Sequence, residues 1–360
     1  MSQFISFAPT NFVLIIKSLI TATYRIFLPE KEMGLWSFFS RKGESGFGFR
    51  STAEQVTDGI DASNITAVIT GATSGIGMET ARVLALRGAT VIIAAISQEL
   101  GEEAKEKIVE QVADAKIEVM ELDLSSLASV RSFAAAFLSS NKPLNLLINN
   151  AGILGCPFQL SEDGIELQFA INYIVNAGHF FLTNLLLDKM KATAQESGIE
   201  GRIVIVASAG HSRTYKSGIR FEKINDPSGY GRFKAYGQSK LAAILHAREL
   251  ARRLQEEGAK VTANSLHPGA IPTNIAQYYI KNMAPLAPLI FISSPFLKTV
   301  QQGAATTCYL ALHPNIEGVS GKYFSDCNED QPAAYGRDAD LAKRLWEFSE
   351  EMTTAKLPQK

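Results

Sequence analysis

Short apolar runs of strand length alternate with amphipathic stretches of helical length along most of this 360-residue chain. We expect strands at residues 66–70, 90–95, 116–122, 144–148, 202–206 and 261–266. Apolar strands that alternate with amphipathic helices indicate a parallel sheet covered on both faces. Residues 60–330 contain no breaker-rich linker and no internal repeat. The pattern therefore predicts an α/β fold, a single doubly wound domain with a parallel sheet and helices on both faces.

The composition excludes several classes of function. Hydrophobic residues make up 46% of the chain and charged residues 20%, as in an ordinary globular protein. The net charge of -1, with Lys and Arg spread thinly, gives no nucleic-acid-binding footprint. Cys156, Cys308 and Cys327 lie far apart, and no His residues show metal-ligand spacing. We therefore expect no disulfide framework, no metal site and no nucleic-acid partner.

Residues 1–50 differ from the rest and are expected to form an N-terminal extension. The apolar stretch from Phe12 to Leu28 is interrupted by Lys17 and Arg25, so it falls short of an uninterrupted membrane span. Three interpretations stay open: a targeting segment, an interfacial membrane anchor, and a dispensable extension. Gly43 to Phe49 is interpreted as a linker. The folded domain is then expected over residues 51–360.

A Gly-rich segment, Thr70-Gly-Ala-Thr-Ser-Gly-Ile-Gly77, stands where the first strand should give way to the first helix. Glycines at such a turn let the backbone approach a pyrophosphate, which the helix N-terminus then binds. The residues expected to bind the cofactor here are Gly71, Ser74, Gly75, Ile76 and Gly77. The alternative is a tight strand–helix connection with no ligand.

Tyr236 and Lys240 stand four residues apart on a predicted helix, so their side chains share one face. A phenol with a pKa near 10 is a poor acid–base catalyst at neutral pH. A neighbouring ammonium group would favour the phenolate and lower the pKa of Tyr236. The tyrosine could then give a proton to a carbonyl oxygen during reduction, or take one from an alcohol during oxidation.

The ordered set TGATSGIG, Asn149-Asn-Ala-Gly152 and Tyr236-Gly-Gln-Ser-Lys240 resembles the short-chain dehydrogenase/reductase family, whose members have a Rossmann domain. The similarity runs from about Ser51 to the C-terminus. Within it, phrases such as STAEQV, MELDLSS and AYGQSKLA resemble the plant Tic32-like branch, which is related to retinol dehydrogenases and protochlorophyllide reductases.

The resemblance implies further site residues. Ser208 would orient the substrate by bonding the reacting oxygen, and Lys240 would also bond the nicotinamide ribose. Asn172 would belong to the proton relay, and Asn150 would lie beside the cofactor. Asp123 would accept a hydrogen bond from the adenine amino group, and Thr273 would bond the nicotinamide amide. For Asp123 and Thr273 a helix-capping role stays open, as does an ordinary polar strand end for Ser208.

The sequence departs from the family pattern at two places. Relatives carry an Arg after the second strand that binds the adenosine 2′-phosphate, whereas Ile96 stands there in this chain. Ser97, Thr73 or Arg82 could partly compensate. The resemblance therefore favours NADP, with NAD as the alternative, because no acidic residue marks an NAD site either.

The second departure follows Asn172. Relatives have a phrase such as FATNHIGHFLLT, and this chain has three additional residues between Asn172 and Gly178. Asn172 is the better match to the family's Asn, and Asn176 is one helical turn away on the same face. Three residues shift the helical phase by roughly 60° from a full turn, so a bulge or a change of register is expected.

These observations favour an NAD(P)-dependent oxidoreductase that transfers a hydride between nicotinamide and a small hydrophobic carbonyl or alcohol substrate. The alternative that the Tic32-like resemblance implies is an NADP-binding, redox-sensing component of the chloroplast inner-envelope import machinery with little turnover. The resemblance implies the chloroplast, inner envelope or stroma, with the cytoplasm as the alternative. Peripheral membrane association and a homo-oligomer stay open.

Overall fold

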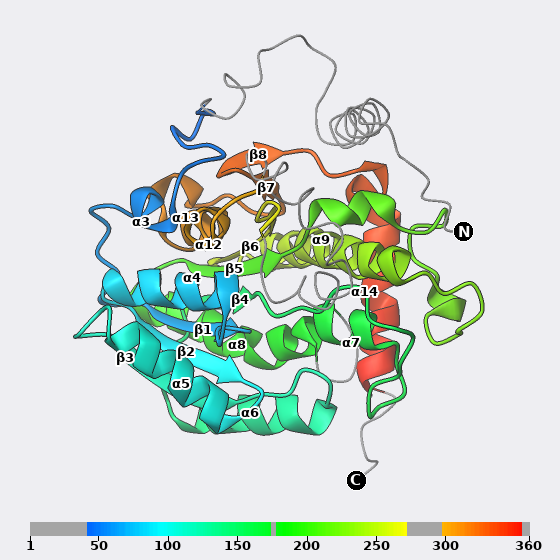
Figure 1. Ribbon diagram of the computed structural model, residues 1–360, viewed down its shortest axis with the longest axis horizontal. Coiled ribbons are helices and arrows are strands. Elements are labelled where there is room, and N and C mark those ends of the chain that lie inside the picture. Colours follow the sequence, from blue (N-terminus) through cyan, green and yellow to red (C-terminus); the bar gives the residue numbers. More distant parts are fainter. Residues whose placement is uncertain (1–41, 174–177, 272–296, 355–360) are drawn as a thin grey trace, which may run out of the picture. The chain divides into compact units, whose positions relative to one another are not determined.

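A single mixed sheet forms the centre of the fold, and its strand order is β3-β2-β1-β4-β5-β6-β7-β8 (Figure 1). The computed structural model describes residues 42–173, 178–271 and 297–354. The strands are β1 (Thr66–Thr70), β2 (Thr90–Ala95), β3 (Lys116–Glu121), β4 (Leu146–Asn149), β5 (Gly201–Val206), β6 (Val261–His267), β7 (Tyr323–Ser325) and β8 (Asn328–Asp330). All neighbours pair in parallel except β7 and β8, which are antiparallel. The predicted doubly wound α/β fold is confirmed.

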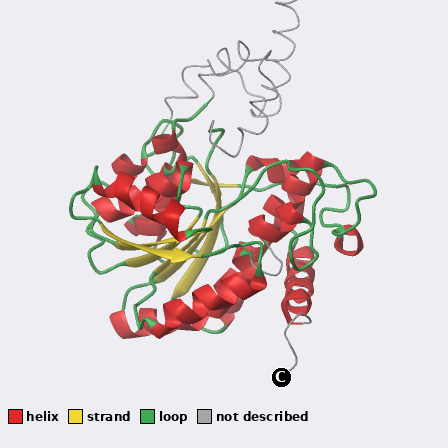
Figure 2. Ribbon diagram, turned by 60° about the horizontal axis from the view of Figure 1, so that its bottom comes forward, coloured by secondary structure: helices red, strands yellow, loops and turns green. Residues whose placement is uncertain are grey.

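Helices cover both faces of this sheet (Figure 2). The helices are α3 (Ala53–Val56), α4 (Gly75–Leu86), α5 (Gln98–Val109), α6 (Leu127–Ser139), α7 (Leu167–Asn172), α8 (His179–Ser197), α9 (Arg232–Glu256), α12 (Val300–Gly303), α13 (Ala305–Leu312) and α14 (Ala339–Thr354). One apolar core joins the sheet to α6, α8, α9 and α14, and the other joins it to α3, α4, α5 and α13. Every residue of β1 is buried, including Thr66 and Thr70 at its ends, so this strand shows no alternation of buried and exposed residues.

The strand order reverses direction between β1 and β4. From β1 the chain builds outward to β2 and β3, then returns to place β4 on the other side of β1. In open α/β sheets a ligand binds beyond the carboxyl ends of the strands at such a reversal. The turns that follow Thr70 and Asn149 therefore meet where a cofactor is expected.

The helix expected to run through Phe180 and Leu187 begins only at His179, because α7 ends at Asn172. Tyr173 leaves the helical path, with φ −142° and ψ −70°, and its carbonyl accepts from Phe180 N at 3.0 Å. The expected change of register is thus a complete break between two helices. Asn176 lies outside the described residues.

Residues 42–50, which were expected to be a linker, pack against the C-terminal part of the domain. Ser45 N donates to Asn328 Oδ1 at 3.1 Å, and Asn328 Nδ2 donates to the Phe47 carbonyl at 3.1 Å. The Phe47 ring meets the Tyr309 ring edge-on at 5.9 Å. The compact unit accordingly begins at Lys42. No helix in the described ranges is both long and apolar enough to cross a membrane.

His246 of α9 is buried among the rings of Tyr173, Phe180 and Trp346, at centroid distances of 5.8, 5.2 and 5.8 Å. Neither of its ring nitrogens has a hydrogen-bond partner among the described residues. Burial lowers the pKa of His246 to about 3, from 6.5. The unfolded chain therefore binds a proton below about pH 6.5 that the folded chain excludes.

We predict that the free energy of unfolding decreases as the pH falls from about 6.5 towards 4. Each such histidine contributes up to about 1.4 kcal/mol per pH unit. In His246→Leu the free energy of unfolding should depend less steeply on pH in this range, by about 1.4 kcal/mol per pH unit, which corresponds to one proton. Urea unfolding at several pH values measures this dependence. Above pH 7.5 the slopes of the two proteins should coincide. An unchanged acid slope in the variant would contradict the assignment.

Candidate active site

The Gly-rich turn between β1 and α4 is closely packed against the turn that follows β4. Gly71 and Gly75 adopt positive φ values of 65° and 54°. A Cβ on Gly71 would stand 2.8 Å from Ala151 Cα, and one on Gly77 would stand 2.3 Å from the Gly71 carbonyl oxygen. Glycine is therefore required here by the backbone conformation and by the packing.

The N-terminus of α4 fits an anionic group. Ser74 is the N-cap, yet its side chain makes no capping hydrogen bond to the first turn. The first N–H groups of a helix have no intrahelical partner and carry the positive end of its dipole. The N–H groups of Gly75, Ile76 and Gly77 thus offer donors to a pyrophosphate, as expected for the start of a dinucleotide-binding helix.

Asn150 fixes the shape of this turn. Its Nδ2 donates to the Thr70 carbonyl at 3.0 Å and to the Gly71 carbonyl at 3.3 Å. The backbone N–H groups of Asn150 and Ala151 both donate to Thr70 Oγ1 at 3.0 Å. The Asn150 side chain therefore holds the Gly-rich turn in place, and its backbone lies at the carboxyl end of β4.

The structure brings Ser208, Tyr236 and Lys240 together. Ser208 follows β5 and accepts from Gly210 N at 3.0 Å, while Tyr236 and Lys240 project from one face of α9. A Cβ on Gly210 would lie 3.0 Å from Tyr236 Cε1, so this glycine packs tightly against the ring. Lys240 Nζ donates to the Val206 carbonyl at 2.9 Å and lies 5.8 Å from the centre of the Tyr236 ring.

The ionisation of this pair differs from the sequence-based expectation. Burial raises the pKa of Tyr236, and the hydrogen bond from Ser208 lowers it only in part. Burial also lowers the pKa of Lys240 to about 8. The expected lowering of the Tyr236 pKa by Lys240 is not seen: burial is the largest cause acting on the phenol, and Lys240 donates to the Val206 carbonyl.

Asn172 lies close to Lys240 and is fully engaged. Its Oδ1 accepts from Ile153 N at 2.7 Å, and its Nδ2 donates to the Ile153 carbonyl and to Ser239 Oγ, both at 2.9 Å. A Cβ on Gly152 would stand 3.1 Å from Asn172 Oδ1 and 3.4 Å from Lys240 Nζ. The Asn172 side chain therefore ties the loop after β4 to α9.

Sequence reasoning missed His179, which lies behind these groups. Its Nε2 is 2.8 Å from Thr70 Oγ1, and its Nδ1 is 3.4 Å from the Asn172 carbonyl oxygen. Burial is the main cause that lowers the pKa of His179 to about 3, and the charge of Lys240 acts in the same direction. The position of His179 in the phrase Gly-His-Phe was the only available signal.

Asp123 closes a turn before α6. Its Oδ1 accepts from Ser125 N at 2.7 Å and from Ser125 Oγ at 2.8 Å, while the N-cap of α6 is Ser126. The Asp123 carboxylate thus stabilises the turn just before α6, although Ser126 and not Asp123 is the N-cap. Its contact with adenine is taken up below as a proposal. Thr273 lies outside the described residues.

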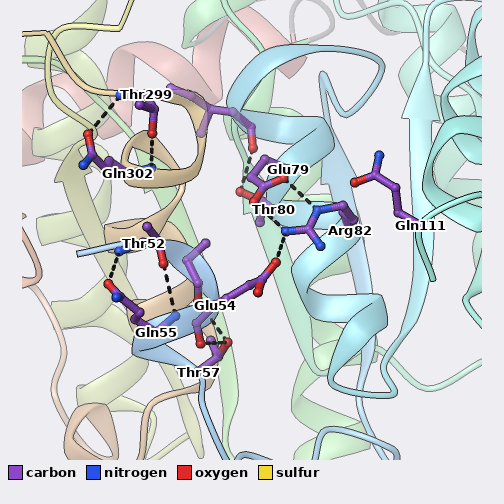
Figure 3. Close-up of polar contacts among 12 residues, drawn as sticks. Thr52, Glu54, Gln55, Thr57, Glu79, Thr80, Arg82, Gln111, Thr299 and Gln302 are labelled. Atoms are coloured by element: carbon purple, nitrogen blue, oxygen red, sulfur yellow. Dashed lines mark hydrogen bonds and ion pairs between the residues drawn. The ribbon is translucent and has the colours of Figure 1, made fainter. Parts of the chain in front are cut away.

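Two of the three polar residues that could partly compensate for Ile96, Arg82 and Ser97, have partners of their own. Arg82 pairs with Glu79 at 2.8 Å and with Glu54 at 2.5 Å (Figure 3), and these partners raise its pKa further. Ser97 caps α5 by accepting from Leu100 N at 3.4 Å. Ile96 itself is 60% exposed. The suggestion that Arg82 could bind a 2′-phosphate is therefore not supported.

We predict that Gly77→Ala lowers the free energy of unfolding by about 1–3 kcal/mol, since the new methyl group must displace the Gly71 carbonyl or the Asn150 side chain. Dinucleotide affinity should fall as well, because the turn moves away from α4. Thermal unfolding and fluorescence titration measure the two effects. Gly231→Ala is the control, since its Cβ would meet nothing closer than 3.6 Å. Equal stability and affinity in the two variants would contradict the packing argument.

Comparison with known proteins identifies the family. The family model for short chain dehydrogenase matches residues 65–220. Short-chain dehydrogenase TIC 32 B, chloroplastic, from Brassica napus is 57% identical over 86% of this chain and 95% of its own. Retinol dehydrogenase 14 from Mus musculus is 43% identical over 80% of this chain and 85% of its own. A crystal structure of an uncharacterized protein from Mycobacterium paratuberculosis is 35% identical with a TM-score of 0.63, and covers 84% of this chain and 98% of its own. The chain belongs to the short-chain dehydrogenase/reductase family, and it is an NAD(P)-dependent oxidoreductase acting on CH–OH and C=O groups.

Proposed function

We propose that this protein transfers a hydride between a nicotinamide cofactor and a hydrophobic carbonyl or alcohol, with Tyr236 as the group that gives or takes the proton. The observation that carries the proposal is the meeting of Ser208, Tyr236 and Lys240 beside the turn that follows β4. The nicotinamide, when bound, supplies or accepts the hydride. The residues of the chain then bind the cofactor, orient the substrate and handle the proton.

Each residue has a separate proposed task. Ser208 Oγ bonds the reacting oxygen, and its hydrogen bond with Tyr236 partly offsets the effect of burial on the phenol. Lys240 bonds the nicotinamide ribose, and Asn172 connects it to the proton relay. The N–H groups from Gly75 to Gly77 bind the pyrophosphate after the Gly71 turn, with Ser74 beside them. Asp123, Asn150 and Thr273 complete the cofactor site.

For the substrate we propose a hydrophobic aldehyde, ketone or alcohol. The names of the retinol dehydrogenase relatives support an apolar substrate, since retinol is itself a long-chain apolar alcohol. The aromatic pair Phe158 and Tyr230, with ring centroids 5.3 Å apart, lies on the loop after β4 and on the segment before Tyr236. This pair adds apolar surface next to the elements that carry the proposed site.

We propose NADP as the preferred cofactor on the basis of the Tic32-like resemblance. No carboxylate stands at position 96, where one would bond the ribose 2′-hydroxyl and select NAD. Arg82, the cation that could compensate there, is paired with Glu79 and Glu54. We therefore expect a modest preference, with NAD also accepted.

A second candidate function is an NADP-binding, redox-sensing component of the chloroplast inner-envelope import machinery. The names of the Brassica napus relatives support it, and they support a chloroplast location, inner envelope or stroma. The break between α7 and α8 beside Asn172 favours slow turnover, because it alters the surroundings of the proposed relay. Residues 1–50 would then carry the targeting or membrane-anchoring information.

We predict that Tyr236→Phe lowers kcat by about 10²- to 10⁴-fold, because the general acid is lost. Cofactor affinity should change little, since the phenyl ring is kept. The measurement is cofactor oxidation with a panel of apolar aldehydes and ketones. Tyr335→Phe is the matched control, because its hydroxyl donates to the Lys216 carbonyl outside this site. Wild-type binding without turnover on any substrate would reject the enzyme and favour the sensor.

We predict that Ile96→Arg raises the NADP-to-NAD preference by about tenfold or more. A charge-assisted hydrogen bond to the 2′-phosphate contributes about 1.5–3 kcal/mol. The exposed position of Ile96 allows the longer side chain without repacking. Ile96→Gln, which is polar but uncharged, is the control. Equal preference in the Arg and Gln variants would show that residue 96 does not face the adenosine ribose.

A further inference from the structure

The short helix α7 carries two buried carboxamides one turn apart. Gln168 is 0% exposed and Asn172 is 2% exposed, and their spacing of four residues places them on one face of the helix. Asn172 bonds the loop after β4 and Ser239 of α9. Gln168 was not among the residues that the sequence singled out, and the proposed mechanism does not use it.

Gln168 joins two segments that flank the proposed active site. Its Oε1 accepts from Gly155 N at 2.5 Å, and its Nε2 donates to Tyr230 OH at 2.7 Å and to the Arg232 carbonyl at 3.1 Å. Gly155 belongs to the loop that follows Gly152. Arg232 is the first residue of α9. One side chain with its carbonyl and both amide hydrogens engaged thus connects the loop after β4 to the start of the catalytic helix.

Glu166 holds Gln168 in this orientation. It is the N-cap of α7, and its carboxylate accepts from Gln168 N at 3.1 Å and Phe169 N at 2.8 Å. Tyr230 OH lies 2.9 Å from Glu166 Oε1 and 3.2 Å from the Cys156 carbonyl. The hydroxyl therefore shares the same polar cluster, and the first turn of α7 has little freedom to rotate.

The position of these bonds matters for the chemistry. Gly152 lies three residues before Gly155, and a Cβ on it would stand 3.4 Å from Lys240 Nζ. Tyr236 lies one helical turn after Arg232. A shift of either segment would change the position of the Tyr236 phenol relative to the loop after β4. An apolar side chain of similar size could fill the same space, but it would not fix this distance, because hydrogen bonds are directional and apolar packing is not.

We infer that Gln168 is a positioning residue for the reaction: it holds the loop after β4 and the first turn of α9 at the separation that places Tyr236 against the reacting oxygen. The inference rests on the proposed function, because it assigns Gln168 its role through Tyr236. It assigns no acid, base or cofactor contact to Gln168 itself.

The test compares the variants Gln168→Met and Gln168→Glu with a control variant in which another buried carboxamide, that of Asn264, is removed. Asn264 of β6 is 3% exposed, its Nδ2 donates to the Val319 carbonyl at 2.6 Å, and its Oδ1 accepts from Lys322 N at 3.0 Å. Asn264→Leu therefore removes a similar set of bonds away from Tyr236. Each full-length variant is assayed for kcat, KM, thermal unfolding and binding of NADPH.

A misplacement of about 1 Å can cost about 100-fold in rate, so kcat of Gln168→Met should fall by about 10- to 100-fold. The Kd of NADPH should stay within about twofold, because the pyrophosphate site at α4 is untouched. Gln168→Glu keeps the acceptor for Gly155 N but has no donor for the Arg232 carbonyl, so its kcat should also fall below that of the wild type. Asn264→Leu should lose stability while its kcat stays within about twofold of the wild type.

Two outcomes overturn the inference. One is a Gln168→Met protein whose kcat matches the wild type. The other is a loss of kcat in Asn264→Leu as large as that in Gln168→Met, which would show a general structural effect. If the wild type shows no turnover, the proposed function fails, and the fluorescence lifetime of bound NADPH decides the inference. That lifetime should change in Gln168→Met and not in Asn264→Leu, and an unchanged lifetime overturns the positioning role.

Discussion

The hydroxyl of Thr70 is the contact on which the site depends. At the carboxyl end of β1 it accepts from the backbone N–H groups of Asn150 and Ala151, both at 3.0 Å, and so joins the two strands at the point where the sheet reverses. With both lone pairs engaged, its proton is left for His179 Nε2 at 2.8 Å, a better partner than the Ile148 carbonyl at 3.5 Å. His179 must then be neutral, which agrees with its pKa of about 3. The Thr70 side chain thus holds both the backbone after β4 and the start of α8, while the Asn150 side chain holds the Gly-rich turn.

Burial also sets the chemical state of the centre. It raises the pKa of Tyr236 and lowers that of Lys240, so desolvation favours the uncharged form of both groups. A phenol in this state keeps its proton and is a weaker acid than a solvent-exposed tyrosine. Ser208 acts against the effect of burial on Tyr236, because its hydrogen bond stabilises the phenolate. In the proposed mechanism the position of the Ser208 hydroxyl therefore matters, because its hydrogen bond lowers the pKa of Tyr236 against the effect of burial.

The sequence predicted the parallel strands β1 to β6, the glycine turn and the meeting of Ser208, Tyr236 and Lys240, because each has a local signature. It did not predict β7 and β8, since Tyr323–Ser325 and Asn328–Asp330 are too short to show periodicity and pair only in the folded sheet. The pairing of Arg82 with Glu54 joins residues 28 positions apart, so no local pattern reveals it. Gln168 was missed for the same reason, because its partners lie on separate loops and its burial is a property of the fold. The sequence therefore predicted the residues that carry chemical groups in local motifs. It did not predict the long-range contacts that hold those residues in position.

The chain between α7 and α8 contains the additional residues that follow Asn172. In a continuous helix three more residues would turn everything that follows by roughly 60°, and would move His179 away from Thr70. The chain instead ends α7 at Asn172 and begins α8 at His179. Tyr173, at the break, stays anchored in the core, with its carbonyl accepting from Phe180 N and its hydroxyl 3.1 Å from Ser349 Oγ of α14. His179 Nδ1 still reaches the Asn172 carbonyl at 3.4 Å. Asn172, Tyr173 and His179 therefore make these contacts without a continuous helix joining α7 to α8.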